Sequence, residues 1–324
     1  MSRCALVTGI GGQDGSLLAE LLLAEGYRVC GVVRSLAAPL PNLAAIGNEL
    51  ELHELELADG EAVRRLLGSV RPDEVYNLAA VSLVPRSWEE PRRTLELGVL
   101  GAAALLDAVL RVEPGIRLFQ ASSAEIFGEA SESPQTELTV LAPRTPYGVA
   151  KASAQLLVGC YRAQHGLHAS AGILFAHESP RRPPEFVTRK VSRAAAMAHL
   201  RLLSELPLGN LSARRDWGAA EDSVRAMWLM LQAEAPDDYV VATGEAHSVE
   251  ELCALAFGHV GLDWREFVRV DESLLRGQAD VGALVGDASK ARARLGWRPT
   301  IGFDELVRRM VDADLALLRA GAAA

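Results

Sequence analysis

Tyr147 and Lys151 stand four positions apart in the segment PYGVAKASAQLL, which has the composition of a helix start. At this spacing the two side chains lie on one face of a helix. A lysine ammonium near a tyrosine lowers the pKa of the phenol, so the phenolate can act as a base toward an alcohol. The pattern alone fits an ordinary helix equally well. A predicted strand that ends in Ser122 and Ser123 adds a hydroxyl for the reacting oxygen, and the combination favours oxidoreductase chemistry.

Glu125 follows Ser123 by two positions. It is either a carboxylate on a loop or a general base beside the reacting carbon. Removal of hydride from an alcohol creates a carbonyl group, and a C–H bond next to a carbonyl is acidic. A carboxylate at this place could therefore remove such a proton.

Three glycines separate the first apolar segment, CALVT at 4–8, from an amphipathic segment, SLLAELLLAEG at 16–26. Gly9, Gly12 and Gly15 have the spacing GxxGxxG. A strand, a tight glycine turn and a helix N-terminus together bring backbone N–H groups close to a pyrophosphate. A glycine pattern alone also fits a simple turn, but this context predicts dinucleotide binding.

The residue at the end of the second predicted strand discriminates between NAD and NADP. NAD enzymes place a carboxylate there, on the ribose hydroxyls, whereas an arginine accommodates a 2′-phosphate. This chain has Arg34, so we expect NADP; a solvated surface arginine is the alternative. Glu56 and Leu57 end the third strand, where a carboxylate could accept a hydrogen bond from the adenine amino group.

The elements that must position these residues alternate along the first half of the chain. Predicted strands cover 4–8, 27–33, 51–57, 74–80 and 117–123, and predicted helices cover 16–26 and 97–112. This alternation indicates an α/β fold with a Rossmann doubly wound parallel sheet. We expect an NADP-binding domain over 1–172. A second, smaller α/β substrate domain should take most of 173–324, interleaved with the first because part of 210–250 returns to the sheet.

Composition limits the class of protein. Of the 324 residues, 49% are hydrophobic and 23% charged, which suits a globular chain with a sizeable core. A net charge of −9 argues against binding to nucleic acid or to a membrane surface, although local arginines can still bind phosphate. No apolar stretch approaches the ~20 residues of a membrane span. Cys4, Cys30, Cys160 and Cys253 form no CxxC pair, so we expect reduced thiols, no metal site and a cytoplasmic protein.

Several longer segments make the chain similar to one family. They are TGIGGQDGSLLAELLLAEGY at 8–27, FQASSAEIFG at 119–128, PRTPYGVAK at 143–151, ILFAHESPRRPPEFVTRK at 173–190, LGNLSARRDWG at 208–218, AMWLML at 226–231, DDYVVATGEAHSV at 237–249 and GDASKARARLGW at 286–297. Over nearly its whole length the chain resembles the GDP-mannose 4,6-dehydratases, which are extended short-chain dehydrogenases/reductases. The resemblance implies a nucleotide-sugar substrate, most readily GDP-mannose, an NADP cofactor and a homodimer or homotetramer.

The resemblance also implies roles for individual side chains. The chemistry would be carried by Ser123, where the family usually has Thr, and by Glu125, Tyr147 and Lys151. The cofactor would be bound by Gly9, Gly12, Gln13, Asp14, Gly15, Arg34, Glu56, Leu57, Leu78, Ala79, Ala80, Tyr147, Lys151, His177 and Arg182. The substrate would be bound by Ser82, Ser122, Glu178, Val187, Lys190, Arg215 and Arg276, and Arg189 would also approach the nucleotide diphosphate.

The implied reaction is redox-neutral and turns an NDP-hexose into its 4-keto-6-deoxy form. Tyr147 takes the C4 hydroxyl proton while hydride leaves C4 for the cofactor. Glu125 removes the C5 proton, water leaves from C6, and hydride returns to C6. Two other functions stay open here. One is a 4-keto-sugar reductase or epimerase on the same scaffold, and the other is an NADP- and sugar-nucleotide-binding protein with weakened catalysis.

The chain departs from the family pattern at several positions near the expected substrate. Ala176 stands where Asn is typical, and Val81 and Leu83 replace two polar residues. Ser35 replaces a second arginine after the second strand. These changes make the expected sugar pocket less polar, which would favour a different sugar, altered chemistry or weak activity.

Overall fold

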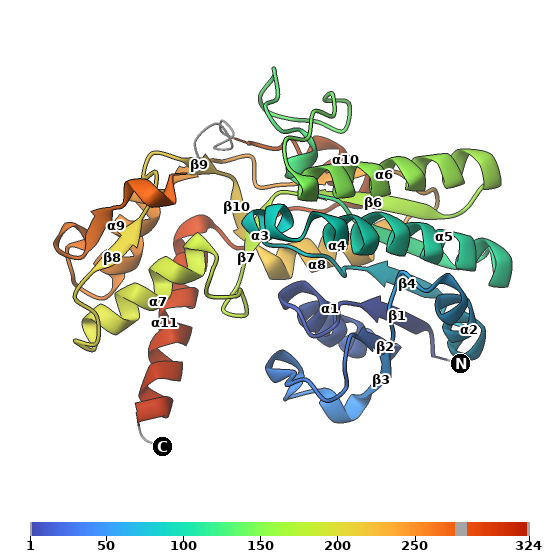
Figure 1. Ribbon diagram of the computed structural model, residues 1–324, viewed down its shortest axis with the longest axis horizontal. Coiled ribbons are helices and arrows are strands. Elements are labelled where there is room, and N and C mark those ends of the chain that lie inside the picture. The colour runs from blue at the N-terminus through green and yellow to red at the C-terminus, as the bar shows by residue number, and fades with distance from the viewer. Residues whose placement is uncertain (1, 276–283, 323–324) are drawn as a thin grey trace.

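A parallel sheet of seven strands forms the centre of the larger part of the molecule (Figure 1). The computed structural model describes residues 2–275 and 284–322. The strand order is β11-β6-β5-β4-β1-β2-β3. The strands are β1 (Cys4–Thr8), β2 (Arg28–Val33), β3 (Leu50–Glu54), β4 (Glu74–Asn77), β5 (Arg117–Ala121), β6 (Ala169–Leu174) and β11 (Tyr239–Val241). The five predicted strands are confirmed, with ends that differ by up to three residues.

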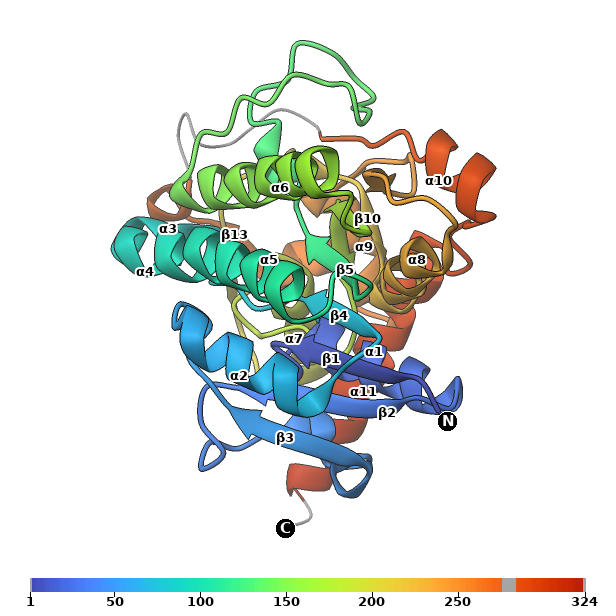
Figure 2. The ribbon, with the colours of Figure 1, turned by 90° about the vertical axis from the view of Figure 1, so that its right-hand side faces the viewer.

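Helices cover both faces of this sheet because successive residues of each strand point to opposite sides. On one face α1 (Gln13–Ala24), α8 (Ala220–Gln232) and α10 (Ser289–Leu295) pack on alternate apolar residues of the strands. The other face is covered by α2 (Gly60–Val70), α5 (Gly101–Val112) and α6 (Pro146–His165) (Figure 2). The predicted helix 97–112 begins as a π-turn, η3 (Glu96–Leu100), which continues α4 (Pro91–Leu95) into α5. The Rossmann fold class is confirmed.

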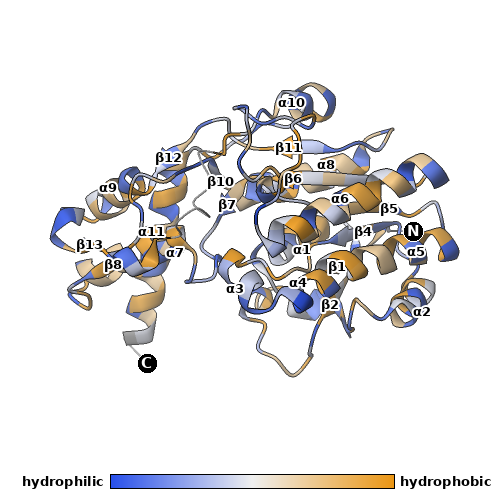
Figure 3. Ribbon diagram, turned by 45° about the horizontal axis from the view of Figure 1, so that its top comes forward, coloured by the Kyte–Doolittle hydropathy of each residue, from blue (hydrophilic) through white to orange (hydrophobic). Residues whose placement is uncertain are grey.

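A smaller lobe is built around three helices, α7 (Val187–His199), α9 (Val249–His259) and α11 (Phe303–Ala322). In Figure 3, hydrophobic residues gather where α7 and α11 meet. A buried ion pair between Arg189 and Asp314, 2.7 Å apart, joins the same two helices. The remaining elements are α3 (Val84–Glu89) and the short strand pairs β7 (Ala176–Glu178) with β10 (Trp217–Ala219), β9 (Arg214–Arg215) with β12 (His247–Ser248), and β8 (Leu206–Leu208) with β13 (Val268–Val270).

Among the helices of the described residues, none combines the length and apolarity needed to cross a bilayer.

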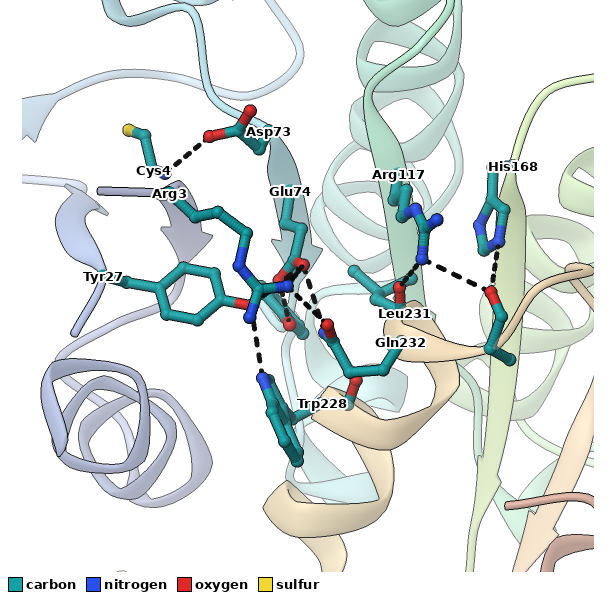
Figure 4. A network of polar contacts seen from close by, with 12 residues as sticks. Arg3, Cys4, Tyr27, Asp73, Glu74, Arg117, His168, Trp228, Leu231 and Gln232 are labelled. Atoms are coloured by element: carbon teal, nitrogen blue, oxygen red, sulfur yellow. Dashed lines mark hydrogen bonds and ion pairs between the residues drawn. The ribbon is translucent and has the colours of Figure 1, made fainter. Parts of the chain in front are cut away.

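Glu74 anchors the edge of the sheet at which the strands begin (Figure 4). Its side chain is only 2% exposed, and a buried carboxylate needs donors and a nearby cation. The hydroxyls of Tyr27 and Tyr76 donate to it at 3.0 and 2.7 Å, and Gln232 donates from α8 at 3.1 Å. Arg3 supplies the cation at 3.4 Å. Burial raises the pKa of Tyr27 to about 12, so its phenol stays protonated and keeps donating.

We predict that Glu74→Ala lowers the free energy of unfolding by about 2–4 kcal/mol, because it leaves two buried tyrosine hydroxyls and the partly buried Gln232 amide without their acceptor. Denaturant titration followed by circular dichroism measures this loss. Glu61→Ala is the control, since the Glu61 side chain is 63% exposed and pairs with Arg64 on the surface of α2. An equal loss in both variants would contradict a stabilising role for the network.

Candidate active site

A cleft between the sheet and the smaller lobe collects most of the predicted site residues. It lies at the carboxyl ends of the strands, where open α/β sheets bind ligands. Fourteen predicted residues line it: Asp14, Leu78, Ala80, Ser82, Ser122, Ser123, Glu125, Tyr147, Lys151, His177, Glu178, Arg182, Val187 and Arg215. Leu83 and Ala176, two of the departures from the family pattern, line the same cleft. Residues more than 200 positions apart in the chain therefore share one cavity.

The glycine turn between β1 and α1 has the geometry of a pyrophosphate cradle. Gly9 has a φ of +69°, which favours glycine, and its carbonyl accepts from the N–H of Gly12 at 3.0 Å. A Cβ on Gly15 would lie 2.4 Å from the carbonyl oxygen of Gly9, so helix and turn approach each other too closely for any side chain. Within the described residues, no side chain caps the start of α1. Its first N–H groups therefore face the turn, as an anion site requires.

Gln13 and Asp14 bind the turn to the strand β7 on the far side of the cleft. Asp14 Oδ2 lies 2.8 Å from His177 Nε2. Gln13 donates to the carbonyl oxygen of His177 at 3.1 Å and accepts from the hydroxyl of Ser179 at 2.9 Å. These two side chains, predicted to contact the cofactor, thus also join the two lobes.

Asp14 and His177 shift each other's pKa toward the charged forms of an ion pair. Burial disfavours the Asp14 carboxylate, but His177 overrides this and lowers the pKa of Asp14 to about 2. Burial likewise disfavours the His177 imidazolium, but the Asp14 charge raises the pKa of His177 above its ordinary value. Each group therefore holds the charged form of the other.

The helix start that carries Tyr147 is held against the catalytic strand. Thr145 caps α6 by accepting from the N–H of Gly148 at 3.0 Å, and Pro146 fills the first helical position. A Cβ on Gly148 would lie 2.6 Å from the carbonyl oxygen of Glu125. Glycine at 148 therefore lets Tyr147 and Glu125 come to the same wall of the cleft.

Tyr147 and Lys151 are both shifted toward their neutral forms. Lys151 Nζ donates to the carbonyl oxygen of Ala121 at 2.8 Å and lies 5.7 Å from the centre of the Tyr147 ring. Burial lowers the pKa of Lys151 to about 8. Burial raises the pKa of Tyr147 to about 12, opposed mainly by a hydrogen bond with Ser123. The sequence predicted that Lys151 lowers the phenol pKa of Tyr147. In the protein without a bound ligand this pKa is raised, so that prediction is wrong.

Three predicted substrate residues are held by protein partners. The Ser122 hydroxyl donates to Gln155 at 2.6 Å. The Glu178 carboxylate, 2% exposed, accepts from Thr188 at 2.7 Å and pairs with Arg182 at 3.0 Å. Lys190 Nζ donates to the carbonyl oxygen of Pro207 at 2.6 Å and lies outside the cleft lining.

Other predictions fall outside the cleft lining. Glu56 pairs with Arg93 at 2.6 Å, which lowers the pKa of its carboxyl. Arg189 is paired with Asp314 and lies outside the lining, and its approach to the nucleotide diphosphate stays a prediction. Gly9, Gly12, Gln13, Gly15, Arg34, Leu57 and Ala79 also lie outside the lining, although Ala79 touches the turn at Gly9. Arg276 lies outside the described residues.

A buried polar ladder beneath the cleft was not predicted. Thr8 donates to Asn77 at 2.7 Å, Asn77 donates to Gln120 at 2.7 Å, and Gln120 donates at 3.0 Å to the Ala121 carbonyl that Lys151 also uses. The three side chains end β1, β4 and β5. A polar residue at the end of each apolar strand was the only available signal, because the partners are 43 and 69 positions apart.

The parallel sheet, the glycine turn and the Ser–Tyr–Lys group define a class of protein, the Rossmann enzymes of the extended short-chain dehydrogenase/reductase type. Residues 6–310 match the model of the GDP-mannose 4,6 dehydratase family. The chain belongs to this family.

Relatives of known name agree with the family match. The chain is 46% identical over 330 residues to GDP-mannose 4,6 dehydratase 2 of Arabidopsis thaliana, covering 98% of this chain and 88% of the relative. It is 43% identical over 343 residues to the GDP-mannose 4,6 dehydratase of Homo sapiens, covering 97% and 92%.

Solved structures share the architecture. The dTDP-glucose 4,6-dehydratase of Streptomyces venezuelae, solved with NAD and TYD bound, has a TM-score of 0.85 at 26% identity and 96% coverage of both chains. The UDP-glucose 4-epimerase of Thermus thermophilus, solved with NAD, has a TM-score of 0.85 at 27% identity, covering 96% of this chain and 99% of that one.

We predict that the pKa of His177 falls below 6.5 in Asp14→Asn and lies above 6.5 in the natural protein. Burial, which disfavours the imidazolium, persists in the variant while the opposing carboxylate is lost. NMR titration of the imidazole signals measures both values. His168, whose pKa is lowered by burial, is the control and should give the same pKa in the two proteins.

The pH dependence of the free energy of unfolding provides a second test of the same ion pair. A raised His177 pKa stabilises the fold fully below pH 6.5, and this stabilisation is lost as the pH rises through the folded pKa. The stability difference between the natural protein and His177→Gln should therefore be larger at pH 5.5 than at pH 9. A constant difference would contradict the ion pair.

Proposed function

We propose that this protein is an NADP-dependent GDP-mannose 4,6-dehydratase that forms the 4-keto-6-deoxy sugar nucleotide. The observation that carries the proposal is the placement of Glu125 in one cleft with Tyr147 and Lys151. A reductase needs only the tyrosine and lysine, whereas a dehydratase needs a further base for elimination. Relatives that carry the dehydratase name at 46% and 43% identity support the same assignment.

The residues of the turn fit a dinucleotide cofactor, since Gly9 and Gly15 allow backbone contacts too close for any side chain and so the tight turn at the start of α1 that a pyrophosphate site requires. A bound nicotinamide supplies a hydride acceptor and donor, so the reaction needs no external reductant. We assign binding of this cofactor to the turn, to Arg182 and to Lys151. The division into an NADP-binding domain at 1–172 and a substrate domain at 173–324 is part of the proposal.

Tyr147 acts as the base for the C4 hydroxyl of the sugar. Its phenol is protonated in the free protein, so it must lose its proton before or during the first step. The ammonium of Lys151 and the guanidinium of Arg182 are the cations in the cleft that favour the phenolate. Ser123, which hydrogen-bonds to Tyr147, orients the oxygen that becomes the C4 carbonyl.

Glu125 acts in the elimination. Once C4 is a carbonyl carbon, the C5–H bond is acidic, and the Glu125 carboxylate removes that proton. The C6 hydroxyl then takes up a proton and leaves as water, so the electron pair from C5 forms the C5–C6 double bond. Residues of β7 and of the start of α7 line the cleft in which this step would take place.

We predict that Glu125→Gln stops turnover after the first oxidation. The near-isosteric amide keeps the fold but cannot accept the C5 proton, so turnover should fall by about 10²–10⁴-fold. Incubation with GDP-mannose should then build up the absorbance of the reduced nicotinamide. Tyr147→Phe is the control, and it should give neither product nor this absorbance. Normal turnover by Glu125→Gln would remove the main support for a dehydratase.

We predict that the purified protein carries NADP rather than NAD. Arg34 follows β2 as an exposed cation, and an arginine at the end of the second strand accommodates a 2′-phosphate in NADP enzymes. Arg34→Glu should weaken NADP binding by about 10- to 100-fold, the size of one or two charge-assisted hydrogen bonds, and leave NAD binding nearly unchanged. Mass spectrometry of the denatured protein and calorimetry measure these outcomes. Arg64→Glu on α2 is a matched charge reversal without the expected effect, and equal affinity for both cofactors in the natural protein would contradict the assignment.

We also propose that the protein forms a homo-oligomer in the cytoplasm, where its four free cysteines would stay reduced. The helical elements η3 and α6 pack against each other, and each carries an exposed apolar side chain. These side chains support a contact with a second copy of the chain. Leu100 is 54% exposed and Leu156 is 58% exposed. Light scattering after gel filtration should give a dimer or tetramer for the natural protein and a smaller mass for Leu100→Glu or Leu156→Glu. Leu138→Glu, on a loop and 92% exposed, is the control.

A further inference from the structure

Four possible metal ligands lie on one face of the sheet where β1, β2 and β3 begin. The register pairs Cys30 of β2 with Glu51 of β3 and Cys4 of β1 with Arg28 of β2. Paired residues of neighbouring strands point to the same side, as do residues two apart in one strand. Cys4, Cys30, Glu51 and His53 are therefore on the same face, which α2 covers in part.

The ligand atoms of this cluster converge. One ligand atom each of Cys30, Glu51 and His53 lies within 4.8 Å of the others, and Cys30 Sγ is 3.5 Å from Glu51 Oε2. Cys4 is not among these converging atoms, but its interaction with Cys30 lowers the pKa of its thiol, and its place on the same face makes it the candidate for a fourth ligand. Ligand atoms about 3–4 Å apart suit a tetrahedral metal with bonds of roughly 2.0–2.3 Å. Small rotations of these side chains would complete such a geometry.

Burial of the two cysteines and of one histidine nitrogen distinguishes this cluster from an ordinary surface group, while the Glu51 side chain is 52% exposed. The two cysteines are 4% and 0% exposed. Nε2 of His53 is buried and has no hydrogen-bond partner among the described residues. A buried imidazole nitrogen without a partner costs free energy unless a ligand or water satisfies it.

We propose that Cys4, Cys30, Glu51 and His53 form a binding site for a soft divalent cation of the zinc type. Two thiolates, one imidazole and one carboxylate are ligand types that zinc accepts in proteins, and thiolates select against magnesium and calcium. The spacing of the cysteines along the chain gave no sign of this site, because its ligands come from three separate strands. The site is independent of the proposed dehydratase function.

In the metal-free protein the guanidinium of Arg28 lies beside Glu51 and Cys30, where the metal ion would supply the positive charge. Arg28 Nη1 lies 2.9 Å from Glu51 and 3.6 Å from Cys30 Sγ. The Arg28 side chain is 41% exposed, so it can turn to solvent when a metal binds. The metal would tie the edge strand β3 to β1 and β2 at the end of the sheet opposite the cleft. Its role would therefore be structural.

Cobalt(II) titration of the metal-free, reduced protein tests the site. We expect one ion per chain, with the thiolate-to-cobalt charge-transfer band and the intense visible bands of tetrahedral coordination. Cys30→Ser and His53→Gln should lose these bands, and zinc should displace the cobalt. Arg28→Gln should bind about two- to fivefold more tightly, because a partly exposed ion pair no longer competes.

Cys160→Ser controls for binding to thiols in general, since Cys160 is an exposed cysteine on α6 and its loss should change nothing. His53→Gln guards against misfolding, because His53 lies on the edge strand and its replacement leaves both cysteines in place. Circular dichroism should show that this variant is folded. The proposal is overturned if the natural protein gives no thiolate band, if His53→Gln keeps the full spectrum, or if only Arg28→Gln binds cobalt.

Discussion

The ion pair between Asp14 and His177 is the contact on which the arrangement of the cleft depends. Asp14 stands on the first turn of α1, directly after the glycine cradle, and His177 stands on the strand that leads into the smaller lobe. Burial disfavours the charged form of each group, the partner favours it, and the contact joins the turn to the strand across the cleft. Ala176 and Glu178, the neighbours of His177, thereby face the wall that carries Glu125 and Tyr147. This contact therefore fixes the position of the glycine turn relative to the substrate side of the cleft.

Burial in the cleft disfavours the charged forms of both Tyr147 and Lys151. Burial shifts the pKa of Lys151 down to about 8 and that of Tyr147 up to about 12, so both groups approach neutrality in the free protein. Two interactions oppose the loss of the proton from Lys151: its hydrogen bond to the Ala121 carbonyl and the negative charge of Asp14. A substrate or cofactor that excludes water strengthens each of these interactions further. The chemistry of this site thus depends on what binds there as much as on the side chains themselves.

Features that depend on residues close together in the chain could be predicted from the sequence. The turn at Gly9 and the helix start at Tyr147 were predictable, because a strand, a glycine and a cap leave local patterns. Contacts between distant segments were not predictable in the same way. Arg189 had the sequence context of a ligand-binding arginine, yet Asp314, 125 positions later, holds it inside the smaller lobe. The shift of Tyr147 was also missed, because burial of the ring opposes the effect of any nearby cation, and burial is a property of the whole fold.

The short strand β11 has a consequence for how much of the chain the central sheet requires. It completes the central sheet beside β6, yet it lies between segments of the chain that build the smaller lobe. A gene fragment that ended after β6 would encode a sheet with a bare hydrogen-bonding edge, and such an edge recruits other chains into aggregates. The central sheet therefore depends on a segment that the chain reaches only after it has begun the smaller lobe, so residues 1–174 alone would leave the edge of β6 unpaired.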